Sequence, residues 1–191
     1  VKGRVFADLF ATPDEHLYQT ILKHHALNLG VSREQKLKHY IHLSGSTSTE
    51  TELWDDCHAR MLEAVGASPW VSGFEFFLNA LRNAAVELAV VTAMPSNDAR
   101  NLLEKNGLDW LAAYVNGGEE EKSTCLKKLG RSESSGHSCC YFGAQLSDLD
   151  AAKRAGWDFI GVTGSALSDQ RLTHEAVTIR DFTEIIYERR C

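Results

Sequence analysis

Hydrophobic and polar positions follow two different patterns in two parts of this chain. From residue 14 to about residue 66, apolar residues such as Leu17 and Ile21 recur at the spacing of a helix face. Asp14 is a typical helix cap and Gly66 a typical stop. The pattern predicts helices over about 14–29, 32–43 and 52–65.

From about residue 70 onward, amphipathic segments alternate with short apolar ones. The predicted helices cover about 74–84, 95–106, 122–129 and 148–155, with a last helix from Asp181. The predicted strands cover about 86–94, 112–116, 138–143, 158–164 and 176–179. Strands that alternate with helices form a parallel sheet covered on both faces. The predicted fold class is therefore α/β, with a three-layer, Rossmann-like parallel sheet core.

The segment RVFADLFAT, residues 4–12, precedes the helical block. It is interpreted as a buried strand over 5–7 that ends at an acid, Asp8. The helical block then interrupts the alternation directly after the first strand. The expected organisation is an α/β core over 1–13 and 68–191, with a small all-helical cap over 14–67.

Composition narrows the class of protein. Hydrophobic residues make up 43% of the 191 residues, and the formal net charge is −6. This acidic balance argues against a nucleic-acid-binding surface. The five cysteines form no CxxC pattern, which favours reduced thiols in a cytoplasmic protein. No apolar run reaches the roughly 18 residues of a membrane span. The oligomeric state cannot be read from the sequence.

Four polar residues lie at or just after predicted strand ends or helix starts. These residues are Asp8, Thr92, Lys122 and Asp148. Each has an ordinary structural role available, since Asp148, for example, could cap the following helix. Carboxyl ends of parallel strands meet at one edge of a sheet, where α/β folds bind ligands. Two carboxylates, a hydroxyl and a cation are therefore expected to converge there.

The order of these residues resembles the haloacid dehalogenase superfamily of hydrolases over nearly the whole chain. That family's first motif, Asp-x-Asp-Gly-Thr after a strand, corresponds to DLFAT at 8–12. Its second motif is a strand ending in Thr or Ser, here AVVT with Thr92, and its third is a Lys before a helix, here Lys122. Its fourth, Gly-Asp-x-x-x-Asp before a helix ending Ala-Gly, corresponds to GAQLSD at 143–148.

The resemblance implies a mechanism and a set of roles. Asp8 would attack the substrate and form a covalent ester, with Thr92, Lys122 and Asp148 as the other catalytic residues. The phosphate-binding residues would be Thr12, Thr92, Ala93 and Lys122. The Mg²⁺ ligands would be Asp8, the backbone carbonyl of Phe10, and Asp148.

Two departures from the family pattern matter. Phe10 replaces the second acid of the first motif, so a general acid–base contribution of roughly 10²- to 10⁴-fold is missing. Ala144 replaces the first acid of the fourth motif, so Mg²⁺ binding is expected to be weak or dispensable. Three functions therefore stay open: a weak or specialised phosphatase-like hydrolase, a metal-independent relative of the 2-haloacid dehalogenases, and a binding protein without turnover.

Overall fold

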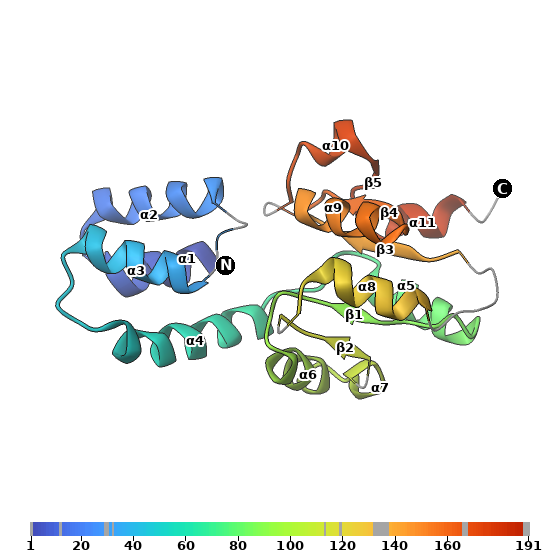
Figure 1. Ribbon diagram of the computed structural model, residues 1–191, viewed down its shortest axis with the longest axis horizontal. Coiled ribbons are helices and arrows are strands. Elements are labelled where there is room, and N and C mark those ends of the chain that lie inside the picture. The colour runs from blue at the N-terminus through green and yellow to red at the C-terminus, as the bar shows by residue number, and fades with distance from the viewer. Residues whose placement is uncertain are drawn as a thin grey trace. The chain divides into compact units, whose positions relative to one another are not determined.

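The chain folds into two compact units, Val1–Ser68 and Pro69–Cys191, which are described separately here (Figure 1). The computed structural model describes residues 2–11, 13–28, 31, 33–112, 114–118, 120–131, 138–165 and 168–188.

The first unit is helical. Its described helices are α1 (Lys2–Phe10), α2 (Glu15–Leu27), α3 (Arg33–Ser44) and α4 (Glu50–Gly66). Asp14 caps α2 as predicted, because its side chain accepts the N–H of Leu17 at 3.0 Å. Thr49 and Glu52 form a capping box at the start of α4. The three helices predicted over 14–65 are confirmed, while Leu29, Gly30 and Ser32, which were expected at helix ends, lie outside the described residues.

The strand predicted over 5–7 is wrong, because these residues lie within helix α1. The physical reason is a helix-spaced apolar face, in which Gly3, Phe6, Ala7 and Phe10 follow i, i+3, i+4 and i+7. Helix α1 contacts α2, α3 and α4. The described part of segment 1–13, which was assigned to the α/β core, thus packs with the helices that were assigned to the cap.

The core of the first unit forms around the buried face of α1. Its largest fully buried side chains are Phe6, Ile21, Leu37 and Tyr40. Phe6 and Tyr40 meet edge to face, with ring centroids 5.0 Å apart. Burying each such side chain contributes about 1.5–3 kcal/mol. Turning α1 into a strand would send every second of its residues to the other face and lose much of this contact.

The second unit contains the remaining elements. Its described helices are α5 (Phe74–Asn83), α6 (Ser96–Lys105), α7 (Asp109–Ala112), α8 (Lys122–Arg131), α9 (Leu146–Ala155), α10 (Leu172–Glu175) and α11 (Thr183–Glu188). Its described strands are β1 (Val90–Val91), β2 (Val115–Asn116), β3 (Cys140–Gly143), β4 (Asp158–Val162) and β5 (Val177–Ile179). The short helices α7 and α10 were not predicted, and β1 is much shorter than the predicted strand over 86–94.

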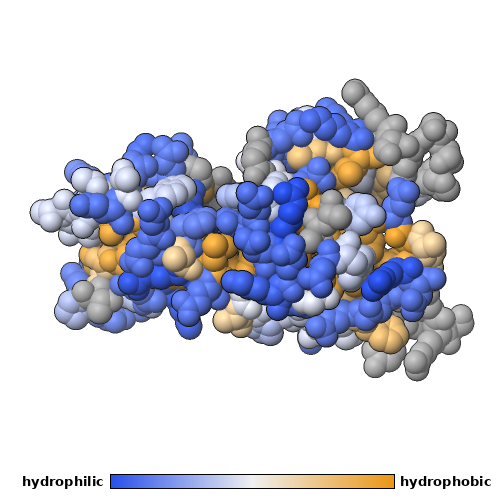
Figure 2. Space-filling view, turned by 90° about the horizontal axis from the view of Figure 1, so that it is seen from below, coloured by the Kyte–Doolittle hydropathy of each residue, from blue (hydrophilic) through white to orange (hydrophobic). Residues whose placement is uncertain are grey.

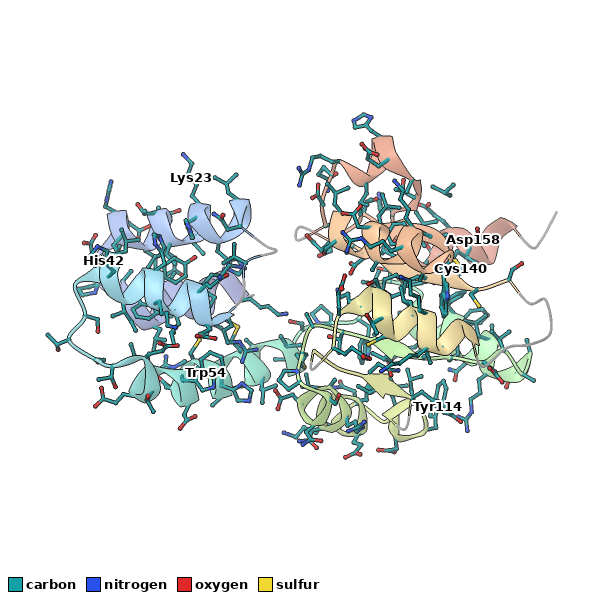
Figure 3. All side chains as sticks on the ribbon, in the orientation of Figure 1. Lys23, His42, Trp54, Tyr114, Cys140 and Asp158 are labelled. Atoms are coloured by element: carbon teal, nitrogen blue, oxygen red, sulfur yellow. The ribbon has the colours of Figure 1, made fainter. Side chains whose placement is uncertain are left out.

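All strand pairs among the described residues of the second unit are parallel. Strand β1 pairs with β2, and β3, β4 and β5 pair in that order. Cys140 and Asp158 begin β3 and β4 side by side, as Figure 3 shows. Helix α9 connects β3 to β4 and ends at Gly156, which adopts φ +75° as helix-ending glycines do. Parallel strands joined through helices confirm the predicted α/β class.

The buried apolar residues of the second unit include two groups. One consists of the buried residues Leu78, Ala99, Leu103, Leu111 and Val115. The other is aromatic, with Phe182 stacked on Phe77 at 4.9 Å between ring centroids. The face shown in Figure 2 is mostly hydrophilic, with hydrophobic side chains in separate areas. Within the described parts of the chain, no helix has both the length and the apolar character needed to cross a membrane.

Candidate functional site

Asp148 is held at the carboxyl end of β3 by the start of helix α9. The helix begins at Leu146, so Asp148 occupies its third position rather than the cap position. Its Oδ2 accepts the backbone N–H groups of Ala144 and Gln145, both at 3.1 Å. A Cβ at Gly143 would lie 2.5 Å from that of Asp148, so glycine is needed for the carboxylate to fit. The side chain of Asp148 is 8% exposed.

Lys122 lies opposite this carboxylate. It is the first residue of α8, and its Nζ lies 2.5 Å from Oδ1 of Asp148. The side chain of Lys122 is 24% exposed, so part of it remains accessible to solvent. An ammonium has three N–H donors, and one bond to Asp148 leaves the others for a ligand. The pairing of Lys122 with Asp148 is thus a charge-assisted contact at the edge of a surface site.

Thr92 directly follows β1 and starts a tight turn. Its Oγ1 accepts the N–H of Met94 at 3.1 Å, which leaves the hydroxyl proton available to an incoming anion. The carbonyl of Met94 in turn accepts the N–H of Gly118 at 2.8 Å. Ala93 lies exposed at the tip of the turn. The segment after β2 therefore fixes the conformation in which Thr92 and Ala93 are presented.

Tyr141 is a site residue that the sequence analysis missed. Its hydroxyl oxygen lies 3.3 Å from the carbonyl oxygen of Val91 and 3.5 Å from Oδ1 of Asp148. Burial, followed by the charge of Asp148, raises the pKa of Tyr141 well above its ordinary value. The signal that could have found this residue is a hydroxyl within the apolar run SCCYFG, because a buried tyrosine hydroxyl needs a partner. Three of the four predicted catalytic positions, Thr92, Lys122 and Asp148, lie in this same second unit.

The remaining predicted site residues belong to the first unit. Asp8 is exposed on the last turn of α1, where it forms a hydrogen bond with Tyr18 of α2. Burial and this hydrogen bond raise the pKa of Tyr18. Phe10, the last residue of α1, packs against Tyr40 with ring centroids 6.0 Å apart. Thr12 lies outside the described residues. A position for Asp8 opposite Lys122 stays a prediction.

The part of the predicted Mg²⁺ site that lies in the second unit offers few free ligands to the ion. Both oxygens of Asp148 are already engaged, one by Lys122 and one by two backbone N–H groups. Ala144 adds only a methyl group, whereas Mg²⁺ requires several free oxygen ligands. Among the residues that the structure describes, no group of three or more His, Cys, Asp or Glu side chains could hold a metal ion.

A hollow of about 510 Å³ lies elsewhere in the second unit. Its lining includes Ser138 and Cys139, before β3, and Trp157 and Asp158, at the start of β4. These residues mark the amino ends of the two strands, whereas Asp148 and Ala144 mark the carboxyl end of β3. The hollow therefore does not belong to the site described above.

The sequence profile of the haloacid dehalogenase-like hydrolases matches residues 10–162. The chain belongs to this family. The matched range includes Thr92, Lys122 and Asp148, but it begins two residues after Asp8.

Solved structures agree with the fold of this haloacid dehalogenase-like hydrolase. A Thermotoga maritima protein assigned as a beta-phosphoglucomutase shares 18% identity at a TM-score of 0.72, over 100% of this chain and 90% of that one. A Clostridium difficile protein assigned as a phosphatase shares 13% identity at a TM-score of 0.60, over 96% and 84% of the two chains. No curated protein sequence matches the chain.

Proposed function

We propose that this chain hydrolyses a small anionic substrate of the phosphomonoester type, and that the Thr92 turn and Lys122 bind the anion. The observation that carries the proposal is the ion pair of Lys122 with Asp148, at the carboxyl end of the parallel strands. Asp148 orients the ammonium, and the Thr92 hydroxyl offers a second donor. Both groups stabilise negative charge on a transferring phosphoryl group. The phosphatase and phosphomutase assignments of the two similar structures are consistent with such a substrate.

Asp8 is the proposed nucleophile. Its carboxylate would attack phosphorus, the bond from phosphorus to the leaving oxygen would break, and water would then hydrolyse the resulting acyl phosphate. The proposal for Asp8 rests on the order of acid, hydroxyl, lysine and acid along the chain. The position of Asp8 on helix α1, rather than at a strand end, does not contribute to it.

The residues at positions 10 and 144 limit the substrates that fit this proposal. Phe10 cannot protonate a leaving group, and Ala144 cannot hold a metal that screens a phosphate dianion. Substrates with good leaving groups, such as aryl phosphates, do not require an acid to protonate the departing oxygen. We therefore expect aryl phosphates to be cleaved at least about 10²-fold faster than alkyl phosphates.

A metal-independent dehalogenase-like hydrolysis is the second candidate. The observation that favours it is that both Asp148 oxygens accept hydrogen bonds beside an alanine at position 144, which leaves few free ligands for magnesium. Halide is a good leaving group that needs no proton, so neither Phe10 nor Ala144 would be a defect in that reaction. A binding protein without turnover has the same anion site and no functional nucleophile.

One panel of assays distinguishes these functions. Aryl phosphates, alkyl phosphates and 2-chloroacids are incubated with the full chain, with and without Mg²⁺. The Asp8→Asn variant is compared with Asp55→Asn, which changes an exposed acid of α4. Phosphate release that is lost only in Asp8→Asn supports the proposal, and chloride release without Mg²⁺ supports the second candidate. No release from any substrate contradicts both and leaves binding alone.

A further inference from the structure

Tyr141 lies between the two halves of the candidate site. It is the second residue of β3, and its hydroxyl approaches the carbonyl of Val91 at 3.3 Å and Oδ1 of Asp148 at 3.5 Å. Val91 directly precedes Thr92, and Asp148 pairs with Lys122. One hydroxyl group therefore connects the strand that carries the Thr92 turn to the carboxylate that orients the ammonium.

The chemistry of these neighbours restricts what the hydroxyl can do. A backbone carbonyl and a carboxylate only accept hydrogen bonds, so the hydroxyl acts only as a donor toward them. It has one proton for two acceptors, and both distances are longer than an ideal O–H···O bond. The proton can therefore move from one acceptor to the other after a small shift. Burial and the charge of Asp148 keep the phenol protonated by raising its pKa.

An anion at the site changes which acceptor the Tyr141 hydroxyl proton binds. The anion attracts the ammonium of Lys122 and weakens its bond to Oδ1 of Asp148. The loss of a hydrogen bond by a buried carboxylate costs about 1–3 kcal/mol unless another donor replaces the lost one. Tyr141 is the donor already at the same oxygen, and its proton can turn from Val91 to Asp148.

We propose that Tyr141 is a positioning residue that donates a hydrogen bond to Asp148 while Lys122 turns toward a bound anion. This inference rests on the proposed anion-binding role of Lys122. It assigns Tyr141 no contact with the substrate, because the hydroxyl acts through Asp148. The residue would lower the cost of moving the ammonium away from Asp148.

Binding of inorganic phosphate to the full chain tests the proposal by calorimetry. Tyr141→Phe removes the hydroxyl and keeps the ring that packs against Phe159 at 6.2 Å. We expect about fivefold weaker phosphate binding. Tyr114→Phe is the matched control, since Tyr114 is 58% exposed, and its affinity should equal that of the wild type. In an Asp148→Ala background, which leaves no side-chain acceptor at this position, Tyr141→Phe should have no further effect, whereas a purely structural role would lower affinity in both backgrounds.

The outcomes separate this proposal from the proposed function. If the wild type binds phosphate and Tyr141→Phe binds it equally well, the role of Tyr141 is refuted and the anion site stands. If the wild type binds no phosphate, the anion site itself is refuted.

A ligand-free measurement then still tests the contact, through the amide exchange of β3 in Tyr141→Phe, Lys122→Met and the double variant. Asp148 depends more on the Tyr141 hydroxyl when Lys122 is absent. The amide exchange of β3 in the double variant should therefore be about fivefold faster than the product of the two single-variant effects predicts. If the exchange of the double variant equals the product of the two single-variant effects, the inference is overturned.

Discussion

Replacing Asp148 by asparagine should destabilise the second unit far more than replacing its exposed neighbour. The carboxylate is 8% exposed, pairs with Lys122 at 2.5 Å and accepts two backbone N–H groups at 3.1 Å. Asparagine has one oxygen and one NH₂ group, so its NH₂ must face either the two N–H donors or the ammonium. In either orientation the NH₂ group faces another N–H donor, and Lys122 loses its negatively charged partner. Breaking a buried pair on one side costs about 3–5 kcal/mol. Because Lys122 keeps access to water, we expect about 3 kcal/mol.

Amide hydrogen exchange of β3 and β4 measures this loss for the second unit alone. Asp148→Asn should lower the free energy of opening by about 3 kcal/mol. The control Asp150→Asn changes an exposed carboxylate two residues further along α9, and its exchange should stay within about 0.5 kcal/mol of the wild type. Equal exchange in the two variants would refute the reasoning, because the ion pair and its two backbone bonds would then contribute nothing.

Three further predictions concern the first unit and the turn beside Asp148. Burial lowers the pKa of His25 to about 4, so the unfolded chain binds more protons, and the first unit should lose about 3 kcal/mol as the pH falls from about 6.5 to 4. Thermal unfolding of His25→Phe should lack that loss, and an identical pH dependence would contradict the assignment. Thr49→Ala removes the capping box of α4 and should cost about 1 kcal/mol by urea unfolding, whereas Thr51→Ala, at an exposed position of the first turn, should cost less. Gly143→Ala, at the end of β3, brings a Cβ to 2.5 Å from that of Asp148 and should weaken phosphate binding about tenfold in calorimetry, while unchanged affinity would contradict the need for glycine at this position.

The elements of the second unit follow from signals that are local in the sequence. Helix α9 is bounded by polar residues before it and by Gly156 after it, and its strands are short apolar runs. That Lys122 and Asp148 lie close together could be predicted, because the carboxyl ends of parallel strands meet at one edge of the sheet. Strand lengths could not be predicted, since pairing partners decide them. Only Val90 and Val91 of the predicted strand over 86–94 pair with β2.

The first ten residues show where one pattern supports two structures. A run such as VFA is apolar enough for a buried strand, and the acid that follows it suggested a strand end. The wider spacing of Gly3, Phe6 and Phe10 fits a helix, and α2, α3 and α4 supply the apolar surface that rewards it. The packing of this segment against other helices favours the helix over the strand, and such packing cannot be seen in a short window of sequence.

The role of Tyr141 could not be read from spacing either. Its hydroxyl meets a carbonyl fifty residues earlier in the chain and a carboxylate seven residues later. The aromatic residue at this position fits an ordinary buried strand equally well. Only the three-dimensional arrangement of β1, β3 and α9 shows that its polar end reaches two acceptors.

The central claim is that the Thr92 turn, Lys122 and Asp148 form one anion-binding site. The most direct test is a titration of the ¹⁵N-labelled full chain with inorganic phosphate, followed by amide chemical shifts. The account predicts saturable shifts at Ala93, Met94 and the first turn of α8, all with one dissociation constant, and their loss in Lys122→Met. Shifts that are absent from these amides, or that persist unchanged in Lys122→Met, would contradict it.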